Sequence, residues 1–404
     1  MSRAAWVLLF VVTMSSTPPA EAQRWDVQSP VDASVALGQG RTLWSSVLQE
    51  PRQLLISLPA NYERSAKAYP VVYLLDGEMQ FSHAAGVLHF LGAFNERIPE
   101  MILVAIVNTD RGRDFVPPAR NPAWRGDPMW REEYERSNPD AFLQFIATEL
   151  IPWVAERYRT APYRVLVGHS FGGVFNTHTL INRPDVFQAH IAISPSLWYD
   201  GEALIARTED GIRRLSSPPR LFISWADHED NIRISTEKLV QALTRKPPPK
   251  LQWTHRYYQG EDHMSTPHRA LYDGLEWVFA GWRMPRPAED SGGPSLSEVE
   301  AHYAALSQRF GFPVAPPATV LSQVAQNLLQ QAKTEDALEL LRRNAREHRD
   351  VAFTHNALAA ALEKLGRREE ALQAYEDAVR AALEDDSPYG DPVGDYREKV
   401  RELR

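Results

Sequence analysis

Residues 52–284 alternate short apolar runs with amphipathic helical runs, and no other feature of the chain restricts its fold as strongly. Continuous apolar runs of four to six residues suit strands that are covered on both faces of a parallel sheet. The predicted strands are 53–58, 71–75, 102–107, 164–167, 190–193, 221–223 and 252–257, and helical spacing recurs over 140–158, near 239–243 and over 271–278. The sequence therefore predicts an α/β fold with a doubly wound, mostly parallel sheet.

The chain has 404 residues, more than one ordinary domain needs. Residues 285–295 are rich in proline, glycine and small polar residues, which is typical of a linker. After them the strand pattern disappears and Ala, Leu, Glu, Gln and Arg dominate. We therefore expect an α/β domain over 23–284, a linker over 285–295 and a small all-α domain over 296–404.

The helical tail contains two copies of a pattern about 34 residues apart, the period of tetratricopeptide repeats. The small and large residues of the second copy are Leu358, Ala359, Leu362, Gly366, Ala371, Tyr375 and Ala378, and those of the first are Val324, Ala325, Leu328, Ala332, Ala337 and Leu341. The first copy departs from the pattern at Asn344. A plain helical hairpin is the alternative. Since two repeats are few for a stable solenoid, we expect packing on flanking helices, on the α/β domain or on a second subunit.

The N-terminus has the pattern of a signal peptide over residues 1–22. Arg3 precedes an apolar run from Ala4 to Met14, which is too short to span a bilayer. Ala20-Glu21-Ala22 then forms a small-x-small cleavage site before Gln23. We expect a periplasmic or secreted protein without membrane insertion.

Composition argues against several classes of partner and cofactor. The net charge of -8 provides no basic surface for nucleic acid. The absence of cysteine excludes disulfides, thiolate metal sites and a cysteine nucleophile. The histidines lack the H-E-x-x-H spacing of a zinc site. We therefore expect no metal and no cofactor.

The segment Gly168-His169-Ser170-Phe171-Gly172-Gly173 follows the strand-like YRVLV and precedes a helix-compatible run. A G-x-S-x-G sequence between a strand and a helix is the nucleophile elbow of α/β-hydrolases. The sharp turn pushes the Ser170 hydroxyl out at the end of the strand, and the glycines leave room for it. The pattern predicts Ser170 as a nucleophile.

A serine hydroxyl needs a base, and in this fold the catalytic groups follow in the order serine, acid, histidine. His263 lies in a loop between the last predicted strand and the final helix, where this fold presents its base. Asp227, Glu229 and Asp230 follow the preceding strand. Position favours Glu229, about three residues past the turn-forming Ala226, and the two aspartates remain alternatives.

The tetrahedral intermediate of ester hydrolysis needs two N–H donors. The backbone of Phe171 is one candidate. The other is expected in the loop Leu75-Asp76-Gly77-Glu78, where Gly77 allows the backbone to turn toward the nucleophile. Glu78 is favoured as the donor and Gly77 comes next, while a simple turn at Asp76-Gly77 is the alternative.

Residues 43–280 resemble serine esterases of the enterochelin (siderophore trilactone) esterase type, which are related to feruloyl esterases and secreted mycolyltransferases. The matching segments are VVYLLDGEMQF, VNTDRGRDFVPP, FIATELIPWVAERYRT, YRVLVGHSFGG, ISPSLWYDG and GEDHMSTPHRAL. A tetratricopeptide-like tail resembles one subgroup. The resemblance implies an α/β-hydrolase with Ser170 and His263 catalytic, an oxyanion N–H from Glu78, and Arg113 and Trp198 in the substrate cleft.

Arg113 and Trp198 also have structural interpretations that involve no substrate. A salt bridge to Asp110 or Asp114 is the alternative for Arg113, and a core position is the alternative for Trp198. Ala226 also departs from the glycine that the family carries before its acid.

The sequence thus predicts an exported serine carboxylic-ester hydrolase that forms an acyl-enzyme and acts on a small-molecule ester such as a siderophore trilactone. Two other functions remain open. One is acyl transfer to an alcohol other than water at the same site. The other is a non-catalytic interaction protein that binds a protein partner, or a second copy of itself, through residues 296–404.

Overall fold

The computed structural model describes residues 36–60, 62–121, 135–212, 215, 218–285, 293–385 and 393–404. The predicted signal peptide lies outside these residues, as does most of the predicted linker. Leu37–Arg404 form one compact unit, and the boundary near 285–295 stays a prediction. Within the described ranges, no helix has the length and apolar character needed to cross a membrane.

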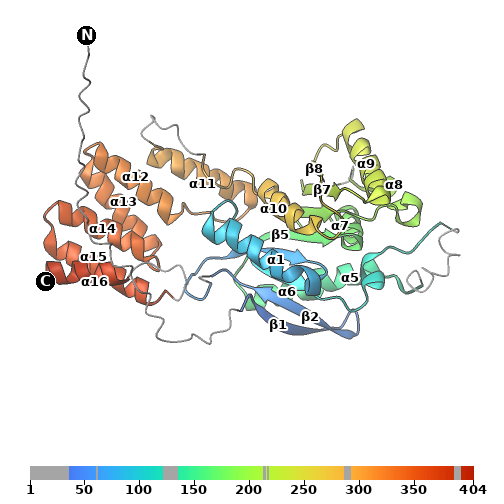
Figure 1. Cartoon of the computed structure of the whole chain (residues 1–404), viewed down its shortest axis with the longest axis horizontal. Helices are drawn as coiled ribbons and strands as arrows, with labels where there is room; N and C mark the ends of the chain where they lie inside the picture. The colour runs from blue at the N-terminus through green and yellow to red at the C-terminus, as the bar shows by residue number, and fades with distance from the viewer. Residues whose placement is uncertain are drawn as a thin grey trace, which may run out of the picture. The chain divides into compact units, whose positions relative to one another are not determined.

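An eight-stranded sheet forms the centre of the α/β part (Figure 1). Its strands are β1 (Gln39–Ser45), β2 (Glu50–Ser57), β3 (Tyr69–Leu74), β4 (Ile102–Ile106), β5 (Thr160–His169), β6 (Ala189–Ile193), β7 (Arg220–Ala226) and β8 (Gln252–Tyr258). Their spatial order is β1-β2-β4-β3-β5-β6-β7-β8. β2 runs antiparallel to β1 and β4, and the remaining neighbours are parallel. The predicted α/β class with a mostly parallel sheet is confirmed.

The continuous apolar runs are strands buried on both faces. All six residues of β3 are buried. Val72 and Leu74 belong to the cluster that also holds residues of the helices α1 (Gly77–His89) and α10 (Thr266–Val278). Val71 and Tyr73 belong to the cluster with residues of the helix α5 (Pro139–Phe145). Because successive side chains of a strand point to opposite faces, a strand covered on both sides shows no polar alternation.

Helices cover the two faces of the sheet (Figure 1). They are α1 (Gly77–His89), η1 (Phe90–Phe94), α2 (Arg111–Phe115), α5 (Pro139–Phe145), η2 (Ile146–Leu150), α6 (Ile151–Arg157), α7 (Phe171–Asn182), α8 (Tyr199–Ile212), α9 (Asp230–Arg245) and α10 (Thr266–Val278). The run predicted over 140–158 is three consecutive segments, α5, η2 and α6. Pro152 stands in the first turn of α6, where a missing N–H is best tolerated.

The tail forms six helices in its described residues. They are α11 (Leu296–Phe310), α12 (Ala318–Gln330), α13 (Thr334–Glu347), α14 (Ala352–Lys364), α15 (Arg368–Leu383) and α16 (Val393–Leu403). α12 and α14 begin at 318 and 352, and α13 and α15 begin at 334 and 368, which is an offset of 34 residues in both pairs. The helix pairs therefore follow the predicted period, and their assignment as tetratricopeptide repeats stays a prediction.

Asn344 explains how the first copy tolerates a polar residue at a crowded position. Its side chain is fully buried, and its Nδ2 donates to the Ala318 carbonyl oxygen and to Ser322 Oγ, both at 2.9 Å. The amide nitrogen thus ties α13 to α12 and finds two acceptors for its two hydrogens.

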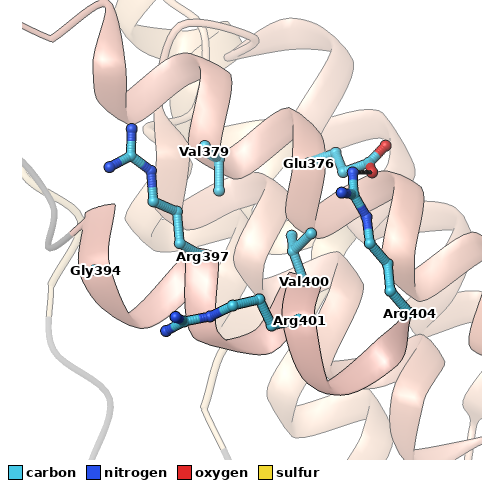
Figure 2. A pocket seen from close by; sticks show the side chains of 7 residues that line it. All are labelled: Glu376, Val379, Gly394, Arg397, Val400, Arg401 and Arg404. Carbon is cyan, nitrogen blue, oxygen red and sulfur yellow. Dashed lines mark hydrogen bonds and ion pairs between the residues drawn. The ribbon is translucent and has the colours of Figure 1, made fainter.

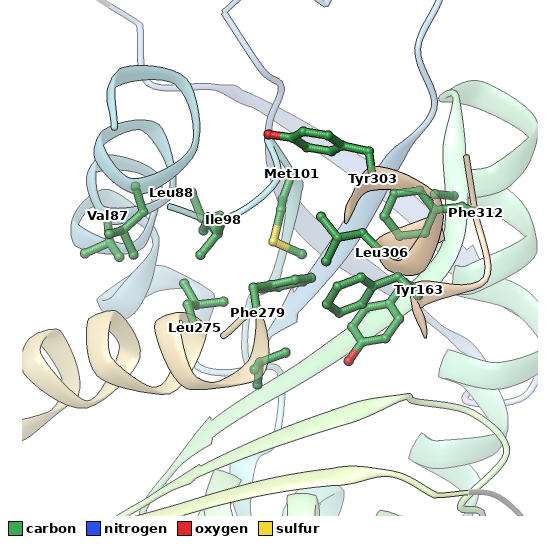
Figure 3. Close-up of a cluster of buried hydrophobic side chains, with 14 of the residues drawn as sticks. Val87, Leu88, Ile98, Met101, Tyr163, Leu275, Phe279, Tyr303, Leu306 and Phe312 are labelled. Atoms are coloured by element: carbon green, nitrogen blue, oxygen red, sulfur yellow. The ribbon is translucent and has the colours of Figure 1, made fainter. Parts of the chain in front are cut away.

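An aromatic seam joins the helical region to the sheet. Phe310, at the end of α11, lies with its ring centroid 5.1 Å from Tyr163 of β5 and 5.2 Å from Phe279, which follows α10. Figure 3 shows Tyr163, Phe279 and Phe312 in this cluster together with Tyr303 and Leu306. The helical region therefore shares a hydrophobic core with the α/β part, one of the three arrangements expected from the sequence.

A polar contact adds to the seam at a second place. Nη2 of Arg64, which lies between β2 and β3, donates to the Asp350 carbonyl oxygen at 2.8 Å, and its Nη1 lies 3.3 Å from an Asp385 carboxylate oxygen.

Truncating the seam should cost stability. Phe310→Ala is expected to lower the free energy of unfolding by about 3–5 kcal/mol, because a large buried side chain is lost and a cavity remains. Urea unfolding followed by circular dichroism measures this loss. Phe94→Ala, whose ring is 63% exposed, is the control and should change stability by less than about 1 kcal/mol. Equal midpoints for the two variants would show that the seam contributes no stability.

Candidate active site

Ser170 occupies a strained turn between β5 and α7. Its backbone has φ 60° and ψ -117°, a region that non-glycine residues rarely adopt. The turn is held by hydrogen bonds from the Ser170 N–H to the Ile193 carbonyl oxygen, at 3.0 Å, and from the Gly173 N–H to the Ser170 carbonyl oxygen, at 3.0 Å. A Cβ added at Gly168 would overlap the Gly172 carbonyl group, so this position requires glycine. The geometry is that of a nucleophile elbow.

Ser196 is the hydrogen-bond partner of the Ser170 hydroxyl. The two Oγ atoms lie 3.2 Å apart, and the Ser196 N–H donates to the Ser170 carbonyl oxygen at 3.2 Å. Ser196 is buried and belongs to the segment that follows β6. Sequence reasoning did not single it out. The only sequence signal was its place in ISPSLWYDG, one of the segments that carry the family resemblance.

His263 lies in the turn between β8 and α10, as expected. Its Nδ1 lies 2.6 Å from Glu229 Oε1, and its ring centroid lies 4.3 Å from that of His169 on the elbow. With Nδ1 directed at a carboxylate, Nε2 is the nitrogen that is left to act as a base. Among the described residues, no hydrogen bond joins His263 to Ser170. Such bonds are often long or poorly aligned before substrate binds.

Glu229 is the carboxylate that the structure brings to His263. Its side chain is 1% exposed, and Oε2 accepts hydrogen bonds from the Ala226 N–H at 2.8 Å and from Ser194 Oγ at 3.0 Å. The two alternatives lie elsewhere. Asp227 accepts hydrogen bonds from Tyr257 and from the Gly260 N–H, and Asp230 is 86% exposed at the start of α9.

Hydrogen bonding keeps Glu229 ionised despite its burial. Burial raises the pKa of Glu229, but hydrogen bonds from His263, the Ala226 N–H and Ser194 outweigh it and hold the pKa below its usual value. A carboxylate whose pKa is depressed by folding stabilises the folded state above its unfolded pKa of about 4.3, and this stabilisation is lost as the pH falls through the folded pKa.

A pH series should show this contribution. The difference in unfolding free energy between the wild type and Glu229→Gln is expected to shrink as the pH falls below about 4. Urea unfolding at several pH values measures the difference. The exposed Asp230→Asn variant is the control and should track the wild type. A difference that does not shrink below about pH 4 would contradict the depressed pKa.

His169 is a poor candidate for the base. Burial, together with the nearby His263 and Arg111, lowers the pKa of His169 to about 3. The ring is therefore neutral near pH 7, and it packs against His263 under the turn.

The two predicted oxyanion donors both stand at helix starts. Asp76, in the left-handed conformation at φ 56°, precedes α1, and Glu78 lies in the first turn of that helix. Phe171 is the first residue of α7. N–H groups in a first helical turn have no acceptor within their helix, and the helix dipole makes this end positive. A Cβ at Gly77 would lie 2.9 Å from the Ile106 carbonyl carbon, so the close approach of this loop to β4 needs glycine.

The two residues expected in the substrate cleft have different surroundings. Nε of Arg113 lies 2.8 Å from Asp114, and Nη1 lies 3.0 Å from Glu50, so its guanidinium is engaged by carboxylates. The salt bridge to Asp114 is the alternative that sequence analysis left open. Trp198 is half-buried, and its ring centroid lies 6.3 Å from that of Phe171, the residue after Ser170.

Arg111 reaches the elbow, although sequence reasoning missed it. Its Nη2 donates to the His169 carbonyl oxygen at 3.1 Å. Arg111 and Arg113 stand two residues apart in the segment DRGRD, and the sequence pattern does not indicate which of them faces the serine.

A hollow of about 430 Å³ lies between α15 and α16, and Figure 2 shows its lining. It is lined by Glu376, Val379, Gly394, Arg397, Val400, Arg401 and Arg404. None of the predicted site residues lines it. Over the described part of the chain, no group of three or more His, Asp or Glu side chains could hold a metal ion.

Known proteins are similar to this chain in sequence and in structure. The family model described as "Putative esterase" matches residues 45–264. An IroE-like serine hydrolase from Shewanella oneidensis has 33% sequence identity and a TM-score of 0.64, over 76% of this chain and 99% of that protein.

Two curated relatives have names that state their activity. The ferri-bacillibactin esterase of Bacillus subtilis is 25% identical over 229 residues, which are 52% of this chain and 79% of the relative. The siderophore triacetylfusarinine C esterase of Aspergillus fumigatus is 25% identical over 281 residues, 58% of this chain and 90% of the relative. Since the family model spans more than half of the chain, and relatives of this kind cleave esters, the chain belongs to the esterase family and is a hydrolase of ester bonds.

Proposed function

We propose that this chain is a serine carboxylic-ester hydrolase in which Ser170, His263 and Glu229 form the catalytic triad. The observation that carries the proposal is the buried Glu229 carboxylate, 2.6 Å from His263 Nδ1, in a protein whose elbow presents Ser170. The three residues come from the ends of β5, β7 and β8. These strands are parallel, so their carboxyl ends meet at one edge of the sheet.

The reaction follows from this arrangement. His263 Nε2 takes the proton of Ser170 Oγ while Oγ attacks the ester carbonyl carbon, and the carbonyl π electrons move to the oxygen. The N–H groups of Phe171 and Glu78 stabilise that oxyanion. Collapse of the intermediate breaks the bond to the leaving oxygen, which receives the proton from His263. Water then attacks the acyl-enzyme by the same route.

Glu229 holds the imidazole in the productive tautomer and stabilises the imidazolium ion that forms, and it does not take up the proton itself. Its hydrogen bonds to the Ala226 N–H and to Ser194 fix the carboxylate in turn. The Glu229 carboxylate is thus oriented by a backbone group as well as by side chains. This favours a single orientation of the His263 imidazole.

The names of the relatives support a substrate class for the first tests. Since proteins named as siderophore esterases match this chain over about half its length, a siderophore ester such as a trilactone is the substrate to test first. The Trp198 ring beside Phe171 would line the cleft. Arg113 would reach an anionic substrate only by leaving Glu50 and Asp114. The signal-peptide pattern of residues 1–22 supports a periplasmic or secreted mature protein.

Covalent labelling tests the mechanism. A fluorophosphonate probe should modify the protein at one residue, and peptide mapping by mass spectrometry should identify it as Ser170. The rates of p-nitrophenyl butyrate and enterobactin hydrolysis should fall in proportion to the fraction of the protein that is labelled. A folded protein that takes up no probe and cleaves neither ester would contradict the proposal. Product analysis with an added alcohol separates hydrolysis from acyl transfer.

A further inference from the structure

The Arg111 side chain bridges the two loops that supply the predicted oxyanion donors. Its Nε lies 2.6 Å from Asp76 Oδ1, and its Nη2 lies 3.1 Å from both Asp76 Oδ2 and the His169 carbonyl oxygen. Asp76 immediately precedes Gly77 and Glu78, and His169 immediately precedes the elbow. One guanidinium therefore holds both loops at once.

The same guanidinium also packs on the elbow. Its central carbon lies 5.4 Å from the ring centroid of Phe171 and 5.5 Å from that of Phe115. The Arg111 side chain is 33% exposed, whereas that of Asp76 is 3% exposed. A cation in contact with an aromatic face and a buried carboxylate is held more rigidly than a surface ion pair.

Asn108 fixes the Glu78 loop from its other side. Asn108 Nδ2 donates to Asp76 Oδ1 and to Glu78 Oε1, both at 2.7 Å, and its backbone N–H donates to Glu78 Oε2 at 3.0 Å. These contacts hold Glu78 through its carboxylate and do not involve its backbone N–H.

α2, which begins at Arg111, is itself anchored in the core. Asp114 is buried and lies 2.6 Å from the fully buried Arg52, and Arg113 pairs with Asp114 and Glu50. This network ties α2 to β2 and defines where the Arg111 guanidinium can lie. Arg113 contributes to this network through Asp114 and Glu50.

We propose that Arg111 is a positioning residue that couples the two halves of the oxyanion hole, so that the N–H groups of Glu78 and Phe171 keep the spacing that the tetrahedral oxyanion needs. The inference rests on the proposed function. Donors stabilise a transition state best when they are already in place and need no reorganisation. Only the planar fork of arginine can bind the Asp76 carboxylate with two nitrogens while it also reaches the His169 carbonyl group, and a lysine ammonium cannot.

Kinetics of Arg111→Gln and Arg111→Lys test this role on the full chain. With the neutral ester p-nitrophenyl butyrate, both variants should lose about 10²-fold in kcat, with KM within about threefold of wild type. Binding of an alkyl boronic acid, which forms a tetrahedral adduct at the serine, should weaken by the same factor as kcat/KM. Arg157→Gln, an exposed arginine on α6, is the matched control and should leave all these values unchanged.

The outcomes separate three explanations. Loss of kcat with parallel loss of boronate affinity supports the positioning role. A raised KM for anionic esters with normal kcat on the neutral ester would show instead that Arg111 binds substrate directly, and a lower melting temperature with unchanged kinetics would leave only a structural role. A wild-type protein that neither labels at Ser170 nor hydrolyses esters would overturn the proposed function itself, whereas an active wild type with fully active Arg111 variants would overturn this inference alone.

Discussion

Ser170→Ala is expected to lower kcat for p-nitrophenyl butyrate hydrolysis by a factor on the order of 10⁶. The substitution removes the only atom that attacks the carbonyl carbon, so that just the oxyanion donors and substrate binding can still assist attack by water. Because the hydroxyl contributes little to ground-state binding, KM should change by only about two- to threefold. Initial rates at saturating ester measure the effect.

A matched serine variant shows that the loss is specific. Ser297→Ala, at an exposed position on α11, should retain wild-type activity. Both proteins should give the same circular dichroism spectrum and melting temperature. Activity of Ser170→Ala within about tenfold of wild type would rule out Ser170 as the nucleophile, since a triad without its nucleophile does not retain such rates.

Glu229→Gln is expected to lower kcat about 10⁴-fold while the protein still folds. The glutamine side chain has nearly the same shape as glutamate, but its amide can present an N–H to His263 Nδ1. The imidazole would then carry its proton on Nε2, which is the tautomer that cannot accept the Ser170 proton. The loss should appear as slower fluorophosphonate labelling of Ser170 as well as in kcat.

The two neighbouring carboxylates are controls for Glu229. Asp230→Asn should keep wild-type activity, because Asp230 is exposed at the start of α9. Asp227→Asn should cost only a few-fold, since Asp227 holds the Gly260 N–H of the loop that carries His263. Near-normal kcat in Glu229→Gln would show that Ser170 and His263 suffice as a pair.

Burial explains which elements of the fold were predictable. β3, β4 and β6 are buried on both faces, and their apolar runs were visible in the sequence. β1 was missed because this edge strand, QGRTLWS, has mostly exposed and partly exposed side chains and no apolar run. α8 was missed as well. It is interrupted by positive φ angles at Asp200, Gly201 and Glu202, where no regular helical period can hold.

The sequence predicted the positions of those site residues whose order along the chain is characteristic of the fold. Ser170 and His263 were located by motif and by position after particular strands, and both stand where these arguments placed them. Glu229 differs from its two neighbours because its carboxylate folds back onto the Ala226 N–H, a local geometry that three adjacent acidic residues do not reveal. Arg111 and Ser196 depend on how α2 and the segment after β6 dock, so only the three-dimensional structure shows their place.

The aromatic seam also limits how the chain can be shortened. Tyr163 and Phe279 belong to the α/β part, yet their rings are covered by Phe310 from α11. A gene shortened to encode only the α/β part would expose this apolar face, which promotes self-association. The helical region is therefore not an optional appendage, since it covers part of the apolar surface of the α/β part.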